Sequence, residues 1–285
     1  MADFEIEKFL DAAGAVKTDD LDWEACARAG ITAEEERVLL YMSDTESHSI
    51  LNLRDLLAGH STRDPEVTSF LSAWVYEELC HGRAIDRLLA AVGRAPERGR
   101  YARVTEGTGL RELTEAALSR AAAALTPRFM ALHMTWGAIN ELSAAAAYQR
   151  LAQTTANPVL ATLVQRMAKQ ERRHFSFYWH QARKRLTGDP SAQRLARFGI
   201  RRFWHLVGSE SGGDSNLDFV SAYLFATPDA RRGLAAAEDS IRELPGMAWF
   251  DLLTRHVEAR VAAWNVRRGY RPDAPGAWPR AALAS

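Results

Sequence analysis

The sequence has few cysteines and no long hydrophobic run, and both absences exclude classes of protein. Two cysteines in 285 residues, Cys26 and Cys80, are too few for a disulfide framework. No apolar segment approaches the roughly 20 residues of a membrane-spanning helix. Lysine plus arginine and aspartate plus glutamate each number 36, so no net charge favours nucleic acid as a partner. The first ten residues lack the basic and apolar regions of a signal peptide, and we expect a cytoplasmic protein.

Strand patterns are also nearly absent, and helix signals dominate. The sequence predicts four long helices, over 33–59, 65–92, 127–154 and 158–186. Thr32 and Glu35 have the spacing of a capping box at the start of the first. Asp64-Pro65 and Asn157-Pro158 place an N-cap residue before a proline in the first turn, which is typical of a helix start. These signals predict an all-α protein.

The long helices form two hairpins, 33–92 and 127–186, joined by a connection of more than 30 residues that contains a helix over 109–124. Two hairpins with one long crossover are the layout of a ferritin-like four-helix bundle. Additional flanking helices are expected over 3–14, 20–29, 190–209, 217–226, 228–242 and 246–268. Residues 210–217 are expected to be a loop and 270–285 an irregular tail. We interpret 1–285 as a single domain, with the core bundle at 33–186 and the C-terminal helices at 190–268.

Two Glu-x-x-His tetrads lie within these long helices. Residues three apart share a helix face, so Glu78 with His81, and Glu171 with His174, each present one carboxylate and one imidazole together. A lone glutamate precedes each tetrad on the previous helix, Glu46 by 32 residues and Glu141 by 30. This arrangement predicts a carboxylate-bridged site for two metal ions.

Four carboxylates and two imidazoles suit iron, with manganese as a substitute, better than copper or zinc. The neighbours of Glu141 are apolar or small, and a buried carboxylate needs a partner. The alternative is that these side chains lie on solvated helix faces, because one Glu-x-x-His tetrad can arise by chance. The matched placement of two tetrads favours the metal site.

The segment 74–82, Trp-Val-Tyr-Glu-Glu-Leu-Cys-His-Gly, resembles the W-x-x-E-E-x-x-H-G signature of the soluble acyl-ACP desaturases. Thr45-Glu46 and Glu171-Arg172-Arg173-His174 extend the resemblance, which covers about residues 30–205. It implies that six residues bind two irons, and that Trp74 matches a tryptophan one turn before a ligand; the alternative for Trp74 is core packing. The implied ligands are Glu46, Glu78, His81, Glu141, Glu171 and His174.

The same resemblance implies that O2 and two electrons are used to dehydrogenate a fatty acyl chain. In that family the acyl chain is carried on acyl carrier protein, a ferredoxin supplies the electrons, and the enzyme is a homodimer. The sequence departs from the family at Ala144, where a threonine is usual, with Ser143 beside it. Two alternatives therefore stay open, a di-iron N-oxygenase or hydroxylase of a small metabolite and a non-catalytic iron-binding protein.

Further polar residues outside the ligand set have weaker signals. His133 precedes Glu141 by two helical turns and is a candidate hydrogen-bond partner of a ligand carboxylate, against a core or surface histidine. Ser143 is a candidate substitute for the missing hydroxyl, although it is rotated about 100° from position 144. A basic segment is a candidate docking surface for an acidic carrier protein, against a solvated helix face. Its residues are Lys184, Arg185, Arg194, Arg197, Arg201 and Arg202.

Overall fold

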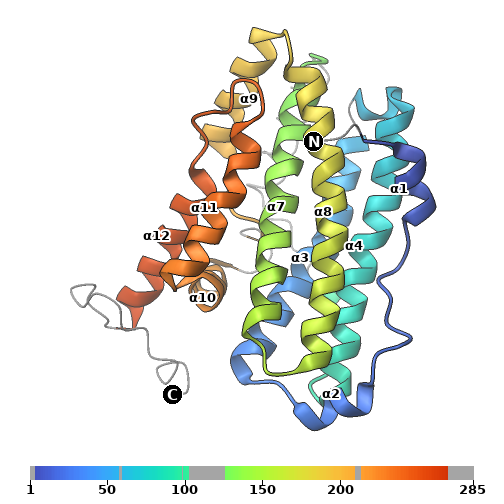
Figure 1. The fold of residues 1–285 in the computed structure, drawn as a ribbon, viewed down its shortest axis with the longest axis vertical. Coiled ribbons are helices and arrows are strands. Elements are labelled where there is room, and N and C mark those ends of the chain that lie inside the picture. The colour runs from blue at the N-terminus through green and yellow to red at the C-terminus, as the bar shows by residue number, and fades with distance from the viewer. Residues whose placement is uncertain (1–3, 58–59, 98, 103–125, 209–212, 269–285) are drawn as a thin grey trace.

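A computed structural model describes residues 4–57, 60–97, 99–102, 126–208 and 213–268. The described residues form helices and no strands. The core is a bundle of four long helices that run side by side (Figure 1), which confirms the expected all-α, ferritin-like fold. They are α3 (Ala33–Leu57), α4 (Pro65–Ala91), α7 (Phe129–Thr154) and α8 (Pro158–Leu186).

The starts of the core helices follow from their capping residues. The Asp64 side chain accepts hydrogen bonds from the first backbone N–H groups of α4, and Asn157 does the same for α8. Thr32 and Glu35 exchange backbone and side-chain hydrogen bonds as a capping box does. A short 3-10 helix, η1 (His60–Arg63), lies in the α3–α4 connection. Local sequence therefore determines where α3, α4 and α8 begin, whereas α7 has no side-chain cap and begins at Phe129, two residues after the predicted start.

Two N-terminal helices lie against the bundle. The first, α1 (Ile6–Ala12), packs on α4, and α2 (Trp23–Ala29) packs on α4 and α8. Both are shorter than the predicted 3–14 and 20–29. The second begins late because Asp22 is its N-cap, whose carboxylate accepts from Ala25 N–H. The amide of Asn157 donates to the carbonyls of Cys26 and Gly30, which fixes α2 against the α7–α8 turn.

Four C-terminal helices cover the opposite side of the bundle (Figure 1). They are α9 (Pro190–Phe203), α10 (Gly213–Phe225), α11 (Pro228–Arg242) and α12 (Leu252–Arg267). Three predicted boundaries were wrong. The predicted helix 190–209 ends at Phe203 because the buried Trp204 is extended. The described part of the predicted loop 210–217 is helical, because α10 begins at Gly213 and not at 217. The predicted start at 246 fails because Gly246 has φ +83°, so α12 begins at Leu252.

Two glycines allow α8 and α9 to approach α7 closely. A Cβ at Gly137 on α7 would lie 2.4 Å from the Tyr178 ring of α8, and one at Gly199 on α9 would lie 2.6 Å from Leu132 of α7. Any larger side chain at either position would force the helices apart. These contacts bring α8 and α9 onto α7, next to the residues that carry the site.

Two sequence predictions, the helix over 109–124 and the irregular tail 270–285, lie outside the described residues. The single-domain assignment also stays a prediction. Among the described residues, no helix combines the length and the apolar character that crossing a bilayer requires.

Candidate metal centre

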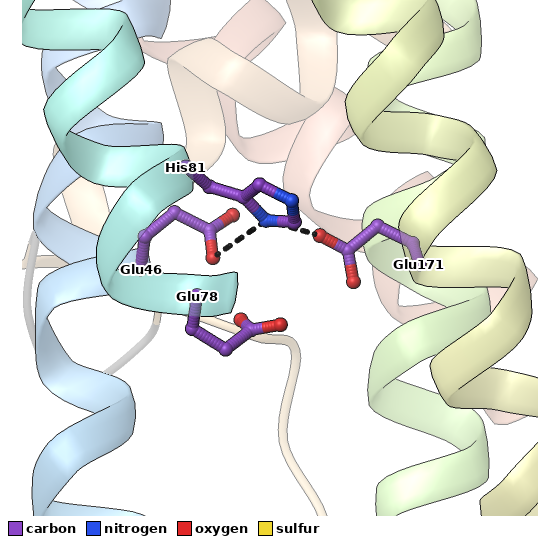
Figure 2. A group of neighbouring side chains, drawn as sticks. All are labelled: Glu46, Glu78, His81 and Glu171. Atoms are coloured by element: carbon purple, nitrogen blue, oxygen red, sulfur yellow. Dashed lines mark ion pairs between the residues drawn. The ribbon is translucent and has the colours of Figure 1, made fainter. Parts of the chain in front are cut away.

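The predicted ligands come together in the middle of the bundle, and all of them are buried. Figure 2 shows Glu46 from α3, Glu78 and His81 from α4, and Glu171 from α8 pointing toward one another. Glu141 of α7 and His174 of α8 complete the cluster. Each of the four core helices therefore contributes to one centre, as the spacing of the tetrads predicts.

The cluster consists of two overlapping groups of four residues whose ligand atoms lie within 4.8 Å of one another. One group contains Glu46 and His81, and the other contains Glu141 and His174. Glu78 and Glu171 belong to both groups. A carboxylate that belongs to both groups can bridge two cations through its two oxygens.

The imidazoles face the cluster through their Nδ1 atoms. His81 Nδ1 lies 3.1 Å from Glu171 Oε1 and 3.8 Å from Glu46 Oε2. His174 Nδ1 lies 3.0 Å from Glu78 Oε1, 3.4 Å from Glu141 Oε2 and 3.3 Å from Glu171 Oε2. Each Nδ1 therefore has carboxylates on several sides, which is the environment of a metal ligand.

Three polar atoms at the centre of the cluster lack a hydrogen-bond partner within the described part of the chain. They are Glu78 Oε1, His81 Nδ1 and Glu171 Oε1. An unpartnered buried polar atom is costly. Two divalent cations would engage all three and would balance the charge of the four carboxylates. The oxygen and imidazole donors suit iron or manganese, so the residues fit a dimetal group.

Burial, and then repulsion from neighbouring carboxylates, raises the pKa of two of the glutamates. Burial, and then the charges of Glu171 and Glu46, raise the pKa of the Glu78 carboxyl well above its usual range. Burial is also the largest cause that raises the pKa of Glu141, to about 8. Without cations these two groups retain protons near neutral pH. A bound cation would displace those protons, so cation binding would be coupled to proton release.

The remaining titrations follow from contacts between the imidazoles and Glu171. Burial alone would lower the pKa of His81, but the carboxylates of Glu171 and Glu46 beside its ring raise that pKa well above its usual range. His174 follows the same pattern through its glutamate neighbours. Burial would raise the pKa of Glu171, yet the two imidazoles lower it. Glu171 is thus the carboxylate that the cluster holds ionised.

Trp74 contacts one of the carboxylates of the cluster. Its indole Nε1–H donates to Glu141 Oε1 at 3.1 Å, and its side chain is buried. The Ser143 hydroxyl donates to the Ile139 carbonyl at 2.7 Å, and the same residue lines a cavity beside Glu46. The His133 ring packs edge-on against Phe129, with centroids 4.4 Å apart. Its role near a ligand carboxylate stays a prediction.

Sequence reasoning missed several residues that contact the ligands. Glu77 is fully buried and its Oε2 lies 2.7 Å from His174 Nε2. Gln170 Oε1 lies 2.9 Å from His81 Nε2. The Tyr148 hydroxyl donates to Glu46. Each lies next to a ligand in sequence or two turns after one, but only the packing of the helices shows which residue it contacts.

An apolar cavity of about 90 Å³ lies between the bundle and the C-terminal helices. Glu46, Ser143 and Tyr148 line its bundle side, so the cavity reaches the metal-ligand cluster. The opposite side is formed mainly by aliphatic side chains of α10, α11 and α12, including Leu224 and Val257. The cavity is therefore a mainly apolar space with its polar groups near the ligands.

The basic residues divide into two sets. Arg185 bonds to Asp64 at 2.6 Å and Lys184 lies 3.9 Å from Glu66, so both are paired with the start of α4. The other four are exposed on α9 and form no ion pair with a described residue; we call them the α9 arginine surface. They are Arg194, Arg197, Arg201 and Arg202. Phe198 and Phe203 beside them are 63% and 50% exposed.

The fold has solved counterparts. The chain is similar to R2-like ligand-binding oxidases. One, a point variant with an aerobically reconstituted Mn/Fe cofactor, matches with a TM-score of 0.53 and 16% identity, over 93% of this chain and 91% of that one. Another variant, reconstituted anaerobically, matches with a TM-score of 0.53 at 17% identity over 93% and 91%. A third, also with an aerobically reconstituted Mn/Fe cofactor, matches with a TM-score of 0.53 and 16% identity, over 93% of this chain and 90% of that one.

These matches establish the fold, which is the ferritin-like helical bundle of the R2-like oxidases. No protein-family profile matches the chain. No curated protein matches it either. Membership of the acyl-ACP desaturases is therefore not established, and the function has to be argued from the site.

Proposed function

We propose that this protein is an O2-dependent dimetal oxidoreductase that acts on an apolar substrate. The observation that carries the proposal is a buried six-residue ligand cluster that opens, at Glu46, onto an apolar cavity. The solved proteins of the same fold are described as ligand-binding oxidases with Mn/Fe cofactors, which supports the same class of activity. The presence of C-terminal helices over the cavity favours an enzyme over a non-catalytic iron-binding protein.

The chain's own residues would hold the ions and position the substrate. Glu78 and Glu171 belong to both ligand groups, and the residues of the two groups would hold two iron or manganese ions. When bound, such a pair supplies two electrons to O2. The Tyr148 hydroxyl fixes Glu46, the ligand that faces the cavity. Aliphatic side chains around the cavity keep water from the substrate, and the cavity fixes which carbon lies near the ligands.

The finer form of the proposal is desaturation of a fatty acyl chain. A CH2–CH2 unit loses two hydrogens, and O2 with two further electrons and two protons gives two waters. The electrons would come from a ferredoxin-type protein, and the acyl chain would arrive on acyl carrier protein. The motif at 74–82 and the apolar lining of the cavity support this form. The α9 arginine surface would bind the acidic carrier, and a homodimer is proposed by the same resemblance.

A second candidate, oxygenation of a small metabolite, is favoured by the size of the cavity. Its volume of about 90 Å³ is below the range of about 300–1,000 Å³ that is typical of ligand sites. Ser143 and Thr45 supply polar groups near Glu46, where a compact substrate would need them. A long acyl chain would require the C-terminal helices to move outward.

The test uses the full chain, stripped of metal and then loaded anaerobically with Fe(II), or with Mn(II) and Fe(II). We expect close to two ions per chain and rapid O2 uptake on mixing. Glu171→Gln should lose both, because it removes a bridging carboxylate, while helicity measured by circular dichroism stays the same. Glu238→Gln is the matched control, because Glu238 is equally buried but caps Thr254 of α12.

Mass spectrometry of fatty acyl and small amine substrates then separates the two candidates. Loss of two hydrogens from an acyl chain supports desaturation, and gain of one oxygen atom supports oxygenation. Metal content near zero after loading, or O2 uptake unchanged in Glu171→Gln, would refute the dimetal oxidoreductase.

A further inference from the structure

One residue of the N-terminal segment, Gly14, bonds to two side chains that contact the histidines of both tetrads. Gly14, just after α1, donates its N–H to Glu77 Oε1 at 2.9 Å and accepts from Gln170 Nε2 at 2.9 Å. Glu77 lies on α4 and Gln170 on α8, and the two side chains also bond directly at 2.8 Å. Gly14, Glu77 and Gln170 therefore form a closed set of hydrogen bonds, which we call the Gly14 network.

The Gly14 network contacts each histidine on the side away from the cluster. Glu77 Oε2 lies 2.7 Å from His174 Nε2, and Gln170 Oε1 lies 2.9 Å from His81 Nε2. The Gln170 amide nitrogen donates to two oxygens, so its Oε1 can only accept, and His81 Nε2 must carry a proton. A carboxylate imposes the same state on His174. In the neutral form that binds a cation, each imidazole then has its free lone pair on Nδ1, which faces the cluster.

The two histidines differ in the charge behind them. Glu77 Oε1 accepts from three donors, Gly14 N–H, Gln170 and Arg173 Nη2 at 2.9 Å, while Oε2 accepts from His174. Four donors on two oxygens leave no place for a proton, so Glu77 is a carboxylate. Gln170 is a neutral amide. A carboxylate behind a ligand imidazole makes it a stronger base and a stronger ligand, which an amide does less well.

We propose that Glu77 and Gln170, held by Gly14, are positioning residues that fix both imidazoles with Nδ1 toward the cluster, and that their unequal charge makes the His174 half of the centre the tighter cation site. This inference rests on the proposed dimetal function and goes beyond it. It assigns Gly14 the role of holding Glu77 and Gln170, and it predicts that a cation binds first in the His174 half of the centre and then in the His81 half.

The experiment is an anaerobic titration of the metal-free full chain with Co(II), followed by visible absorption and equilibrium dialysis. The wild type should bind two ions in two resolved steps. Glu77→Gln should weaken the tighter step on the order of 10–100-fold and leave the weaker step within about threefold. Gln170→Leu should do the reverse, because it removes the acceptor behind His81, while Glu77 keeps its charge and its donors Gly14 and Arg173.

Two further variants keep the result interpretable if Glu77→Gln folds poorly. Gly14→Pro replaces the N–H that Glu77 accepts with the proline Cδ, at a position where the added Cβ meets no atom within 4 Å. It should weaken the tighter step in the same direction. Glu238→Gln again removes a buried carboxylate far along the chain, and both Co(II) steps should stay as in the wild type.

A structural readout complements the affinities. In the Zn(II)-loaded, 15N-histidine-labelled protein, both imidazoles should show a metal-bound Nδ1 and a slowly exchanging Nε2–H. Glu77→Gln should speed exchange of one Nε2–H only. Two Co(II) steps that respond equally to Glu77→Gln, or coordination through Nε2, would overturn the inequality and leave the metal centre standing. A wild type that binds no Co(II) would refute the centre itself.

Discussion

At the scale of single residues, the indole of Trp74 shows how a side chain outside the ligand set can control a ligand. Its N–H donates to Glu141 Oε1, and burial raises the pKa of that carboxyl to about 8. The indole N–H thus fixes one oxygen of the Glu141 carboxyl, a group that otherwise binds a proton near neutral pH. Orientation of a ligand carboxylate by a hydrogen bond is a common way to increase its affinity for a cation.

Trp74→Phe should therefore weaken cation binding at the half of the centre that contains Glu141. We expect a loss on the order of 10-fold in the corresponding Co(II) step, because the hydrogen bond to Glu141 is gone. Trp179→Phe is the matched control, since the Trp179 indole is also buried but donates to the Ser240 carbonyl. It should lower the melting temperature without changing either step. Equal Co(II) curves for wild type and Trp74→Phe would contradict the role of the indole.

The six ligands could be predicted from the sequence because their arrangement depends on helix periodicity. A glutamate and a histidine three apart share a face in any helix, so Glu78 with His81 needed no tertiary information. Glu77 and Gln170 could not be assigned, because their partners lie on other helices and on Gly14, which is in the non-helical segment after α1. A second acid directly before a ligand, as in Glu77-Glu78, is the one signal that pointed there.

At the scale of elements, the C-terminal helices are fixed to each other by ring contacts at the end of α9. The His256 ring of α12 stacks on Trp204, with centroids 5.4 Å apart and planes inclined by 10°. Burial, and then the charges of His205 and Arg255, lower the pKa of His256. The neighbouring Val257 lines the cavity, so this stack supports the cavity wall.

Stability should therefore fall as the pH falls below the ordinary histidine pKa of about 6.5. Below that pH the unfolded chain binds a proton at His256, while the folded chain does not until its lower pKa is reached, so the unfolded state is favoured. His256→Gln should flatten this part of the pH profile of the urea midpoint. The profile above pH 7 serves as the internal control. If the urea midpoints of wild type and variant change in parallel between about pH 7 and pH 5, His256 is not the cause of the pH dependence.

The helix starts that Asp64 and Asn157 cap were predictable, and several other helix boundaries were not, for a physical reason. Asp64 and Asn157 cap through bonds to N–H groups two and three residues away, which is local information. The end of α9 depends on Trp204, whose indole donates to Asn140 of α7 and whose ring is buried. That contact joins residues 64 positions apart, and no local pattern contains it.

At the scale of the whole molecule, charge is unevenly distributed although the net charge is zero. Many arginines elsewhere pair with acids, such as Arg166 with Asp20 and Arg100 with Asp44. The α9 arginine surface has no acidic partner among the described residues. Two exposed phenylalanines, Phe198 and Phe203, lie beside it. Unpaired charge beside exposed aromatic rings favours association with an acidic protein.

Charge reversal at Arg201 and Arg202 should slow association with acyl carrier protein by about 10-fold at low salt. The difference should shrink as salt is added, because ions screen exposed charges. Stopped-flow or surface-plasmon kinetics would measure both effects. The matched control reverses Arg232 and Arg255, which are exposed on α11 and α12. Equal association rates for the two double variants would refute a specific role for the α9 arginine surface.

The cavity has two walls that come from separate stretches of the chain. Residues 41–46 and 143–148 form the wall that bears a metal ligand, and residues 206–257 form the other. None of the six ligands lies in the second stretch. Substitutions within residues 206–257 can therefore change the shape of the cavity and leave the metal-ligand cluster unchanged. Under the proposed function, substitutions in this second stretch could therefore change the substrate while all six ligands are kept.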